Sequence, residues 1–185
     1  MFMMRFGMRS ETTDPQARAS MYGAVLDMAS WSEAKGCFAT VLSEHHAADD
    51  GYLPSPVPLA AAIAARTSTM AINVAALLVS LYEPVKLAED LAVVDLISRG
   101  RVSYVVGIGY RDEEFDMFGV DRRGRGKLVE ARIGLLRRLW NGEEVEFASQ
   151  RRPTVGRGEH FEHRTLAFVC RGRPCCFLTR DASIF

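Results

Sequence analysis

The feature that most constrains the fold of this chain is a regular alternation of short β-type runs with longer helical segments. Apolar runs rich in β-branched residues predict strands near residues 4–8, 37–43, 71–79 and 101–107. Each run is followed by a segment whose apolar residues recur at helical spacing. Strands that alternate with helices favour a parallel sheet, because a parallel connection needs a crossover. The sequence therefore predicts an α/β fold of about four β/α units in series.

The first helical segment carries clear signals at both ends. Asp14 is a good N-cap residue and Pro15 fits the first helical position. Gly36 tolerates the left-handed conformation that commonly follows a helix. The apolar stripe predicted to face the core consists of Met21, Val25, Met28 and Trp31.

The later helices are bounded in the same way. Ser55 and Pro56 open a second helix through Ala65, and Pro84 opens a third that ends at Gly100. A short helical turn is expected at 112–118, and a long fourth helix follows it and stops at Asn141-Gly142. The residues predicted to face inward are Leu87, Leu91 and Val94 in the third helix and Val129, Ile133, Leu136 and Trp140 in the fourth.

Four β/α units are half of a TIM (β/α)₈ barrel, which typically needs about 250 residues. The chain has 185 residues, so a partial barrel is predicted over residues 1–145. Residues 146–185 are predicted to form an irregular, Arg-rich tail, since seven Arg and three acidic residues follow from Arg151 onward without a sustained period. We interpret this tail as an irregular extension or as the product of a truncated or frame-shifted reading frame.

Charge and hydropathy argue against several classes of partner. The 23 basic and 23 acidic side chains give a formal net charge of zero, which does not favour a nucleic-acid or membrane surface. No run approaches the roughly 20 apolar residues of a membrane span. The start of the chain, residues 1–8, is too short an apolar run for a secretory signal. A cytoplasmic protein with no nucleic-acid or membrane partner is therefore expected.

Candidate catalytic groups follow the second predicted strand. In α/β barrels the catalytic residues lie at the carboxyl ends of strands. Here the strand ends in Ser43-Glu44-His45-His46, and a polar loop follows at 47–52. A carboxylate beside two imidazoles can place a neutral base near pH 7. The alternative is that both histidines are loop residues that only form hydrogen bonds.

The ends of the third and fourth strands carry small residues. Ala75 and Ala76 would let a flat ring approach the backbone, or they only pack against a helix. The Gly107-Ile108-Gly109 sequence leaves little Cβ bulk at the end of its strand, or only makes a tight turn. It is not the dinucleotide-binding fingerprint, because Asp112 stands where a third glycine is required. These weak signals all fall at the same end of consecutive strands.

Two clusters contain potential metal ligands, the first after the second predicted strand and the second in the tail, and neither predicts a metal site. In the first, adjacent histidines on a strand point to opposite faces, so one metal rarely takes both. In the second, the irregular spacing lacks a Cys-x-x-Cys pair. A metal-dependent hydrolase therefore stays a third hypothesis only. The first cluster is Glu44, His45, His46, Asp49 and Asp50, and the second is His160, His163, Cys170, Cys175 and Cys176.

Taken in order and with their spacing, several segments resemble the luciferase-like monooxygenases. The resemblance runs from about Met4 to Val145. The segments that carry it are Ser43-Glu44-His45-His46, the Ala-rich helix opened by Pro56, Val74-Ala75-Ala76-Leu77-Leu78, Glu83 to Asp90, Ser98-Arg99-Gly100-Arg101-Val102, Gly109 to Phe115 and Phe118-Gly119.

The resemblance implies an FMN or deazaflavin cofactor over the mouth of the barrel. His45 matches the active-site histidine of the family, which implies a role as a base. Ala75-Ala76 matches a position that often carries a non-proline cis peptide behind the isoalloxazine ring. At the end of the fourth strand, Gly107 and Ile108 replace a cysteine and an arginine of the luciferases proper. The residues expected to bind the cofactor are Glu44, Ala75, Ala76, Gly107, Ile108 and Gly109.

Two hypotheses from different classes follow. The first is a flavin-dependent oxidoreductase or monooxygenase that acts on a small organic substrate, with reduced FMN and O₂ or with a deazaflavin that transfers hydride. The second is an inactive, truncated fragment that only self-associates. The resemblance also implies a homodimer through helices 2 and 3, in which small residues would let the helices approach closely. The residues expected to face the partner are Ala60, Ala61, Ala64 and Ala65.

Overall fold

The computed structural model describes residues 1–145, so the predicted tail and its candidate zinc cluster lie outside the described residues. The chain divides into two compact units. Unit 1 comprises Met1–Leu78 and Val93–Gly109, and unit 2 comprises Val79–Ala92 together with the chain from Tyr110 onward.

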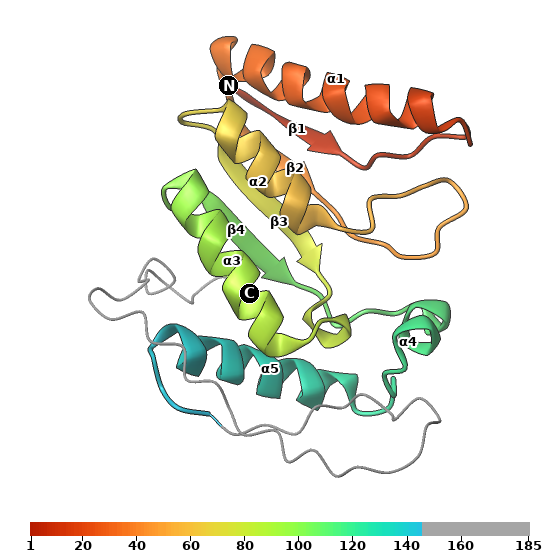
Figure 1. The fold of residues 1–185 in the computed structure, drawn as a ribbon, viewed down its shortest axis with the longest axis vertical. Coiled ribbons are helices and arrows are strands. Elements are labelled where there is room, and N and C mark those ends of the chain that lie inside the picture. Colours follow the sequence, from red (N-terminus) through yellow and green to blue (C-terminus); the bar gives the residue numbers. More distant parts are fainter. Residues whose placement is uncertain (146–185) are drawn as a thin grey trace. The chain divides into compact units, whose positions relative to one another are not determined.

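Unit 1 is built on a four-stranded parallel sheet (Figure 1). Its strands are β1 (Phe2–Phe6), β2 (Cys37–Leu42), β3 (Ala71–Leu77) and β4 (Val102–Val106). They lie in sequence order, β1-β2-β3-β4, and every neighbouring pair is parallel. The edges of β1 and β4 pair with no further strand among the described residues, so the sheet is open. This confirms the predicted α/β partial barrel.

Two predicted strand boundaries were wrong. The first strand spans Phe2–Phe6 and not residues 4–8, because the chain turns after Phe6 and Met8 has a positive φ of 59°. The third ends at Leu77 and not at residue 79, because Val79–Leu81 form a short 3₁₀ helix, η1. The strands β2 and β4 lie within one residue of their predicted limits.

Helices α1 (Pro15–Ala34) and α2 (Pro56–Arg66) lie side by side against the sheet (Figure 1). The Asp14 side chain accepts hydrogen bonds from the backbone N–H groups of Gln16 and Ala17, which confirms the predicted cap. The predicted stripe of α1 was wrong in part. Met28 and Trp31 are exposed, because the face that packs inward carries Val25, Ala29 and Ser32.

The two faces of the sheet differ in exposure. Ile72 and Val74 of β3 are fully buried on one face. Asn73 alternates to the other face, where its side chain donates to the Ser103 hydroxyl at 3.2 Å. On the edge strands, Val105 keeps 51% of its surface exposed. An all-parallel sheet is normally covered on both faces, and within the described residues of unit 1 this face is not.

The amino-terminal edge of the sheet is tied together by two charged side chains. The Arg101 guanidinium donates to the carbonyls of Ala64, Thr67 and Met70 at 2.8–3.0 Å, where α2 ends and β3 begins. The Glu33 carboxylate, at the end of α1, accepts from the backbone N–H groups of Ser68, Thr69 and Met70. Burial would raise the pKa of Glu33, but these hydrogen bonds hold it below its ordinary value.

Unit 2 packs α5 (Arg125–Trp140) against η1. The Arg132 guanidinium donates to the carbonyls of Val79 and Tyr82, and burial lowers its pKa. The Trp140 indole N–H donates to the Ala88 carbonyl at 3.0 Å. Helix α3 (Pro84–Ser98) runs through both units, and helix α4 (Asp112–Phe118) precedes α5. The predicted inward residues Leu87, Leu91, Val94, Val129 and Leu136 are buried.

Candidate functional site

The segment after β2 leaves the sheet in an irregular conformation that positions Ser43, Glu44, His45 and His46. Because β2 ends at Leu42, strand alternation does not govern the directions of the two imidazoles. The backbone N–H of His45 donates to the Leu53 carbonyl at 3.1 Å, so the loop returns on itself. The Arg5 guanidinium donates to the buried Ser43 hydroxyl at 2.6 Å and fixes the start of the loop to β1.

Glu44 and His46 form a buried pair beneath this loop. The Glu44 side chain has no exposed surface, and His46 is 7% exposed. One carboxylate oxygen of Glu44 lies 2.8 Å from Nε2 of His46, and the other accepts the backbone N–H of Leu78 at 2.7 Å. A single side chain therefore connects the carboxyl end of β2 to the residue that follows β3.

His45 lies in different surroundings. It is partly exposed, and its ring packs edge-to-face on Tyr52, with centroids 4.9 Å apart. The Arg9 guanidinium lies over the Tyr52 ring, 4.7 Å from its centre, and pairs with Asp50 at 3.2 Å. Such stacking is favourable for a planar cation on an aromatic face. Of the two adjacent histidines, His45 is the one that keeps contact with solvent.

The loop that carries Tyr52 is held across the end of β1 by backbone hydrogen bonds. The Leu53 N–H donates to the Gly7 carbonyl at 3.1 Å, and the Ser10 N–H donates to the Asp50 carbonyl at 2.7 Å. Gly51 has a φ of 66° and lies directly against the Arg18 side chain. These contacts join residues far apart in sequence, which is why Arg9 and Tyr52 had no signal in the sequence analysis.

The peptide bond between Ala75 and Ala76 is cis, as the family resemblance implied. The pairing of β3 with β4 shifts here, because Ala75 pairs with Val105 but Leu77 pairs with Val106, so Ala76 is bulged. Both alanines keep part of their surface exposed.

Gly107 is explained by this bulge. Its backbone N–H donates to the Leu77 carbonyl at 2.9 Å, and a Cβ added to it would stand 2.7 Å from the Ala76 Cβ. A side chain at this position would therefore clash with the bulge. Ile108 is half exposed, and Gly109 has a φ of 72°, so the second glycine serves a turn.

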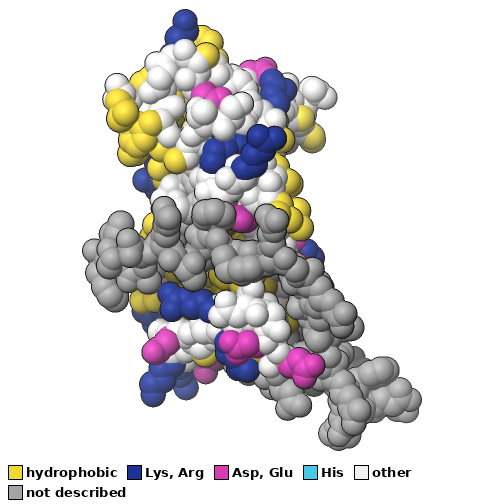
Figure 2. Space-filling model, turned by 90° about the vertical axis from the view of Figure 1, so that its left-hand side faces the viewer, with side chains coloured by type: hydrophobic (Ala, Val, Ile, Leu, Met, Phe, Trp, Pro, Cys, Tyr) yellow, Lys and Arg dark blue, Asp and Glu magenta, His cyan; other side chains and the backbone are white. Residues whose placement is uncertain are grey.

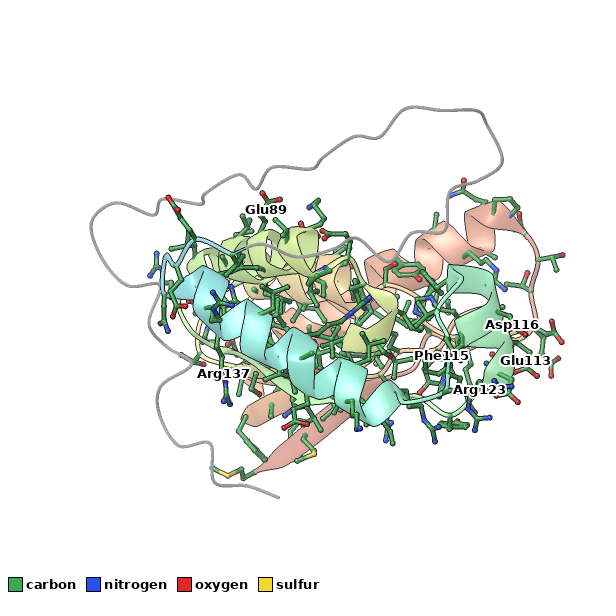
Figure 3. The ribbon with its side chains drawn as sticks, turned by 90° about the horizontal axis from the view of Figure 1, so that it is seen from below. Glu89, Glu113, Phe115, Asp116, Arg123 and Arg137 are labelled. Carbon is green, nitrogen blue, oxygen red and sulfur yellow. The ribbon has the colours of Figure 1, made fainter. Side chains whose placement is uncertain are left out.

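A separate cavity of about 900 Å³ lies in unit 2, around α4 and the segment that follows it. Asp116, Arg123 and the buried Phe115, which Figure 3 labels, are among the residues that line it. No residue predicted from the sequence to form the site lines this cavity. Its side chains mix acids and arginines, and Arg122 is already paired with Asp112.

The described residues provide neither a metal site nor a membrane-spanning helix. Among residues 1–145, no group of three potential ligands is placed to hold a metal ion. This holds also for the cluster around Glu44 and Asp49. None of the described helices is long and apolar enough to cross a membrane. On the face shown in Figure 2, the coloured basic and acidic side chains are interspersed.

The sequence model of the luciferase-like monooxygenases matches residues 3–167. The chain belongs to this family. The oxygenase component of the flavin-dependent trigonelline monooxygenase of Acinetobacter baylyi is a luciferase-like relative that is 25% identical over 145 residues, covering 76% of this chain and 40% of the relative.

Solved structures agree with the family assignment. Monooxygenase RslO1 of Streptomyces bottropensis superimposes with a TM-score of 0.70 at 27% identity, over 81% of this chain and 46% of that protein. The oxygenating constituent of 3,6-diketocamphane monooxygenase from Pseudomonas putida, solved with FMN, gives a TM-score of 0.71 at 19% identity, over 80% and 41%. The luciferase-like chain thus spans less than half the length of these proteins.

Proposed function

We propose that this chain provides the half of a flavin-dependent monooxygenase site that carries the acid–base residue, His45. The observation that supports the proposal is the contrast between two neighbouring imidazoles at the end of β2. His46 is buried against Glu44, whereas His45 is partly exposed and held at its backbone by Leu53 and at its ring by Tyr52. A general base must reach its substrate and keep its orientation, and the partial exposure and the two contacts of His45 support such a role.

The residues around His45 fit a planar redox cofactor. Ala75 and Ala76 are small and partly exposed at the end of the neighbouring strand, and Ile108 beyond Gly107 offers an apolar surface. Bound flavin would supply the redox chemistry, and the chain would orient it, exclude water and move a proton at His45. The reaction would use reduced FMN and O₂, or a deazaflavin that transfers hydride, on a small organic substrate.

FMN is the cofactor to test first. The trigonelline monooxygenase is described as flavin-dependent, and the diketocamphane monooxygenase of the same fold was solved with FMN. We further propose a homodimer through α2 and α3. Ala61 and Ala65 face outward as this requires, but Ala60 and Ala64 are buried within the protomer, so the expectation that all four face a partner was wrong.

The test is a titration of this chain with oxidised FMN, reduced FMN and a deazaflavin, followed by flavin fluorescence. Turnover is then measured in the chain completed with the carboxyl-terminal half of RslO1, with and without His45→Ala. Removing a general base should lower the rate by about 10²- to 10⁴-fold. Glu130→Ala, on the exposed surface of α5 and away from the proposed dimer interface, serves as the control. Unchanged turnover in the His45→Ala protein would refute the role of His45, and absence of flavin binding in both proteins would refute the cofactor.

A further inference from the structure

The buried Glu44 carboxylate contacts other protein groups, and its burial argues against direct contact with a cofactor. Its side chain has no exposed surface, so a flavin placed over the strand ends could not touch it without displacing protein groups. Its two oxygens instead contact two different segments of the protein: one lies against His46, and the other accepts the backbone N–H of Leu78. A buried carboxylate is expected to be satisfied in this way, because an unpaired one would be very costly.

The Leu78 contact lies behind the part of β3 that borders the candidate site. Leu78 follows Leu77, the residue after the bulged Ala76, and the Leu77 carbonyl accepts the N–H of Gly107, which follows β4. The ends of three strands are thus joined through one chain of hydrogen bonds, from Glu44 after β2 to Leu78 after β3 and Gly107 after β4. The ladder between β2 and β3 ends at the Leu42–Val74 pair, so if the Glu44 contact is lost, the backbone that follows Ala76 loses this further attachment to the segment after β2.

The His46 contact decides where that ring carries its proton. An ionised carboxylate is only an acceptor, so a neutral His46 that bonds to Glu44 must hold its hydrogen on Nε2. The Nδ1 atom of the neutral ring is then left as an acceptor. A fixed tautomer also fixes the ring orientation, as carboxylate partners of histidine do in metal and catalytic sites.

We infer that Glu44 is a positioning residue, which sets the His46 tautomer and holds the end of β3 in place for the flavin, and does not itself contact the flavin. The inference rests on the proposed function for its flavin part, while its effects on His46 and Leu78 belong to the chain alone. The Glu44 carboxylate offers one oxygen to His46 and one to the Leu78 N–H, whereas a glutamine side chain has only one oxygen in all. Glu44→Gln must therefore lose one acceptor while the shape of the side chain is kept.

The experiment uses the whole chain labelled with ¹⁵N, as wild type and as Glu44→Gln. Imidazole ¹H–¹⁵N correlation spectra report the His46 tautomer, hydrogen exchange reports the Leu78 amide, and fluorescence titration with FMN reports cofactor affinity. In the variant we expect a shift of His46 toward the Nδ1–H tautomer or a roughly tenfold faster exchange at Leu78. The loss of one hydrogen bond should weaken FMN affinity by roughly 3- to 10-fold.

Two further variants keep the test decisive. Glu33→Gln is the matched control, because Glu33 also accepts backbone N–H groups but at the amino-terminal edge of the sheet. It should change neither the His46 signals nor FMN affinity. His46→Gln can still donate to Glu44, so Leu78 should keep its slow exchange. If Glu44→Gln leaves both the His46 tautomer and Leu78 exchange as in the wild type, the inference is overturned.

The FMN titration distinguishes a failure of this inference from a failure of the proposed function. If the wild-type chain binds no FMN, the proposed cofactor fails for this chain, and the tautomer and exchange measurements alone decide the role of Glu44. If the wild type binds FMN and Glu44→Gln binds it equally well despite altered His46 and Leu78 signals, the positioning of the flavin is refuted.

Discussion

The two ends of the parallel sheet are built from the same interactions but differ in what they leave accessible. At the amino-terminal end, Arg101 and Glu33 bind the backbone where α2 passes into β3. At the carboxyl-terminal end, Glu44 also binds backbone, at Leu78, but it does so beneath the partly exposed His45. In barrels of this class the amino-terminal end serves stability and the carboxyl-terminal end serves catalysis. Charged side chains therefore stabilise both ends of the sheet. Catalysis requires in addition a reactive side chain, such as His45, that remains accessible to a substrate.

The largest expected effect on stability comes from the amino-terminal end. Arg101→Met removes the donor for four backbone carbonyls, those of Ala64, Thr67, Met70 and Ser98. Unsatisfied buried acceptors cost about 1–3 kcal/mol each, and water would reach some of them, so we expect a loss of about 3 kcal/mol. Urea denaturation measures it, with Arg101→Lys as an intermediate case. If FMN affinity fell in proportion while the protein stayed folded, the separation of the two ends would be wrong.

Gly107→Ala should give the next largest effect, at the carboxyl-terminal end. The new Cβ would stand 2.7 Å from the Ala76 Cβ, so the bulge must move. Overpacking of this kind costs about 1–3 kcal/mol. Gly134→Ala in α5 is the matched control, because nothing lies within 4 Å of the added Cβ. There alanine should stabilise by up to about 1 kcal/mol, since glycine is a poor helix former. Thermal unfolding of both variants checks the opposite signs.

The smallest effect is expected from Glu33→Gln, and it depends on pH. The pKa of Glu33 is lowered from its ordinary value of 4.5 by backbone hydrogen bonds, so the charged form is favoured in the folded state. Its contribution is therefore complete above pH 4.5 and is lost as the pH falls through the lowered pKa. At pH 7 we expect the variant to be less stable by about 1 kcal/mol. Urea titrations at pH 7 and pH 3 should show the difference shrinking, and a difference that grows toward pH 3 would contradict this assignment.

The sequence by itself determined the order of elements and the end of the sheet at which the candidate site lies. Alternating strands and helices imply a parallel sheet, and local signals such as Asp14 before Pro15 set where helices begin. The segment around His45 followed from its position after a strand. These features depend on neighbours within a few residues or on rules of connection, and a sequence displays both directly.

Only the tertiary structure decided which side chains meet. Met28 and Trp31 fit an apolar stripe but are exposed, because the direction in which α1 meets α2 and β2 selects a different face. The family resemblance implied that Glu44 binds the cofactor, and the structure shows in addition that its carboxylate lies buried between His46 and Leu78, of which Leu78 is 34 residues away in sequence. Gly107 was predicted to leave little Cβ bulk at the end of its strand or to make a tight turn, and the structure shows that the space a side chain would need is filled by Ala76. Each of these outcomes depends on contacts between distant segments, whose geometry is fixed by packing in three dimensions and has no counterpart in local sequence pattern.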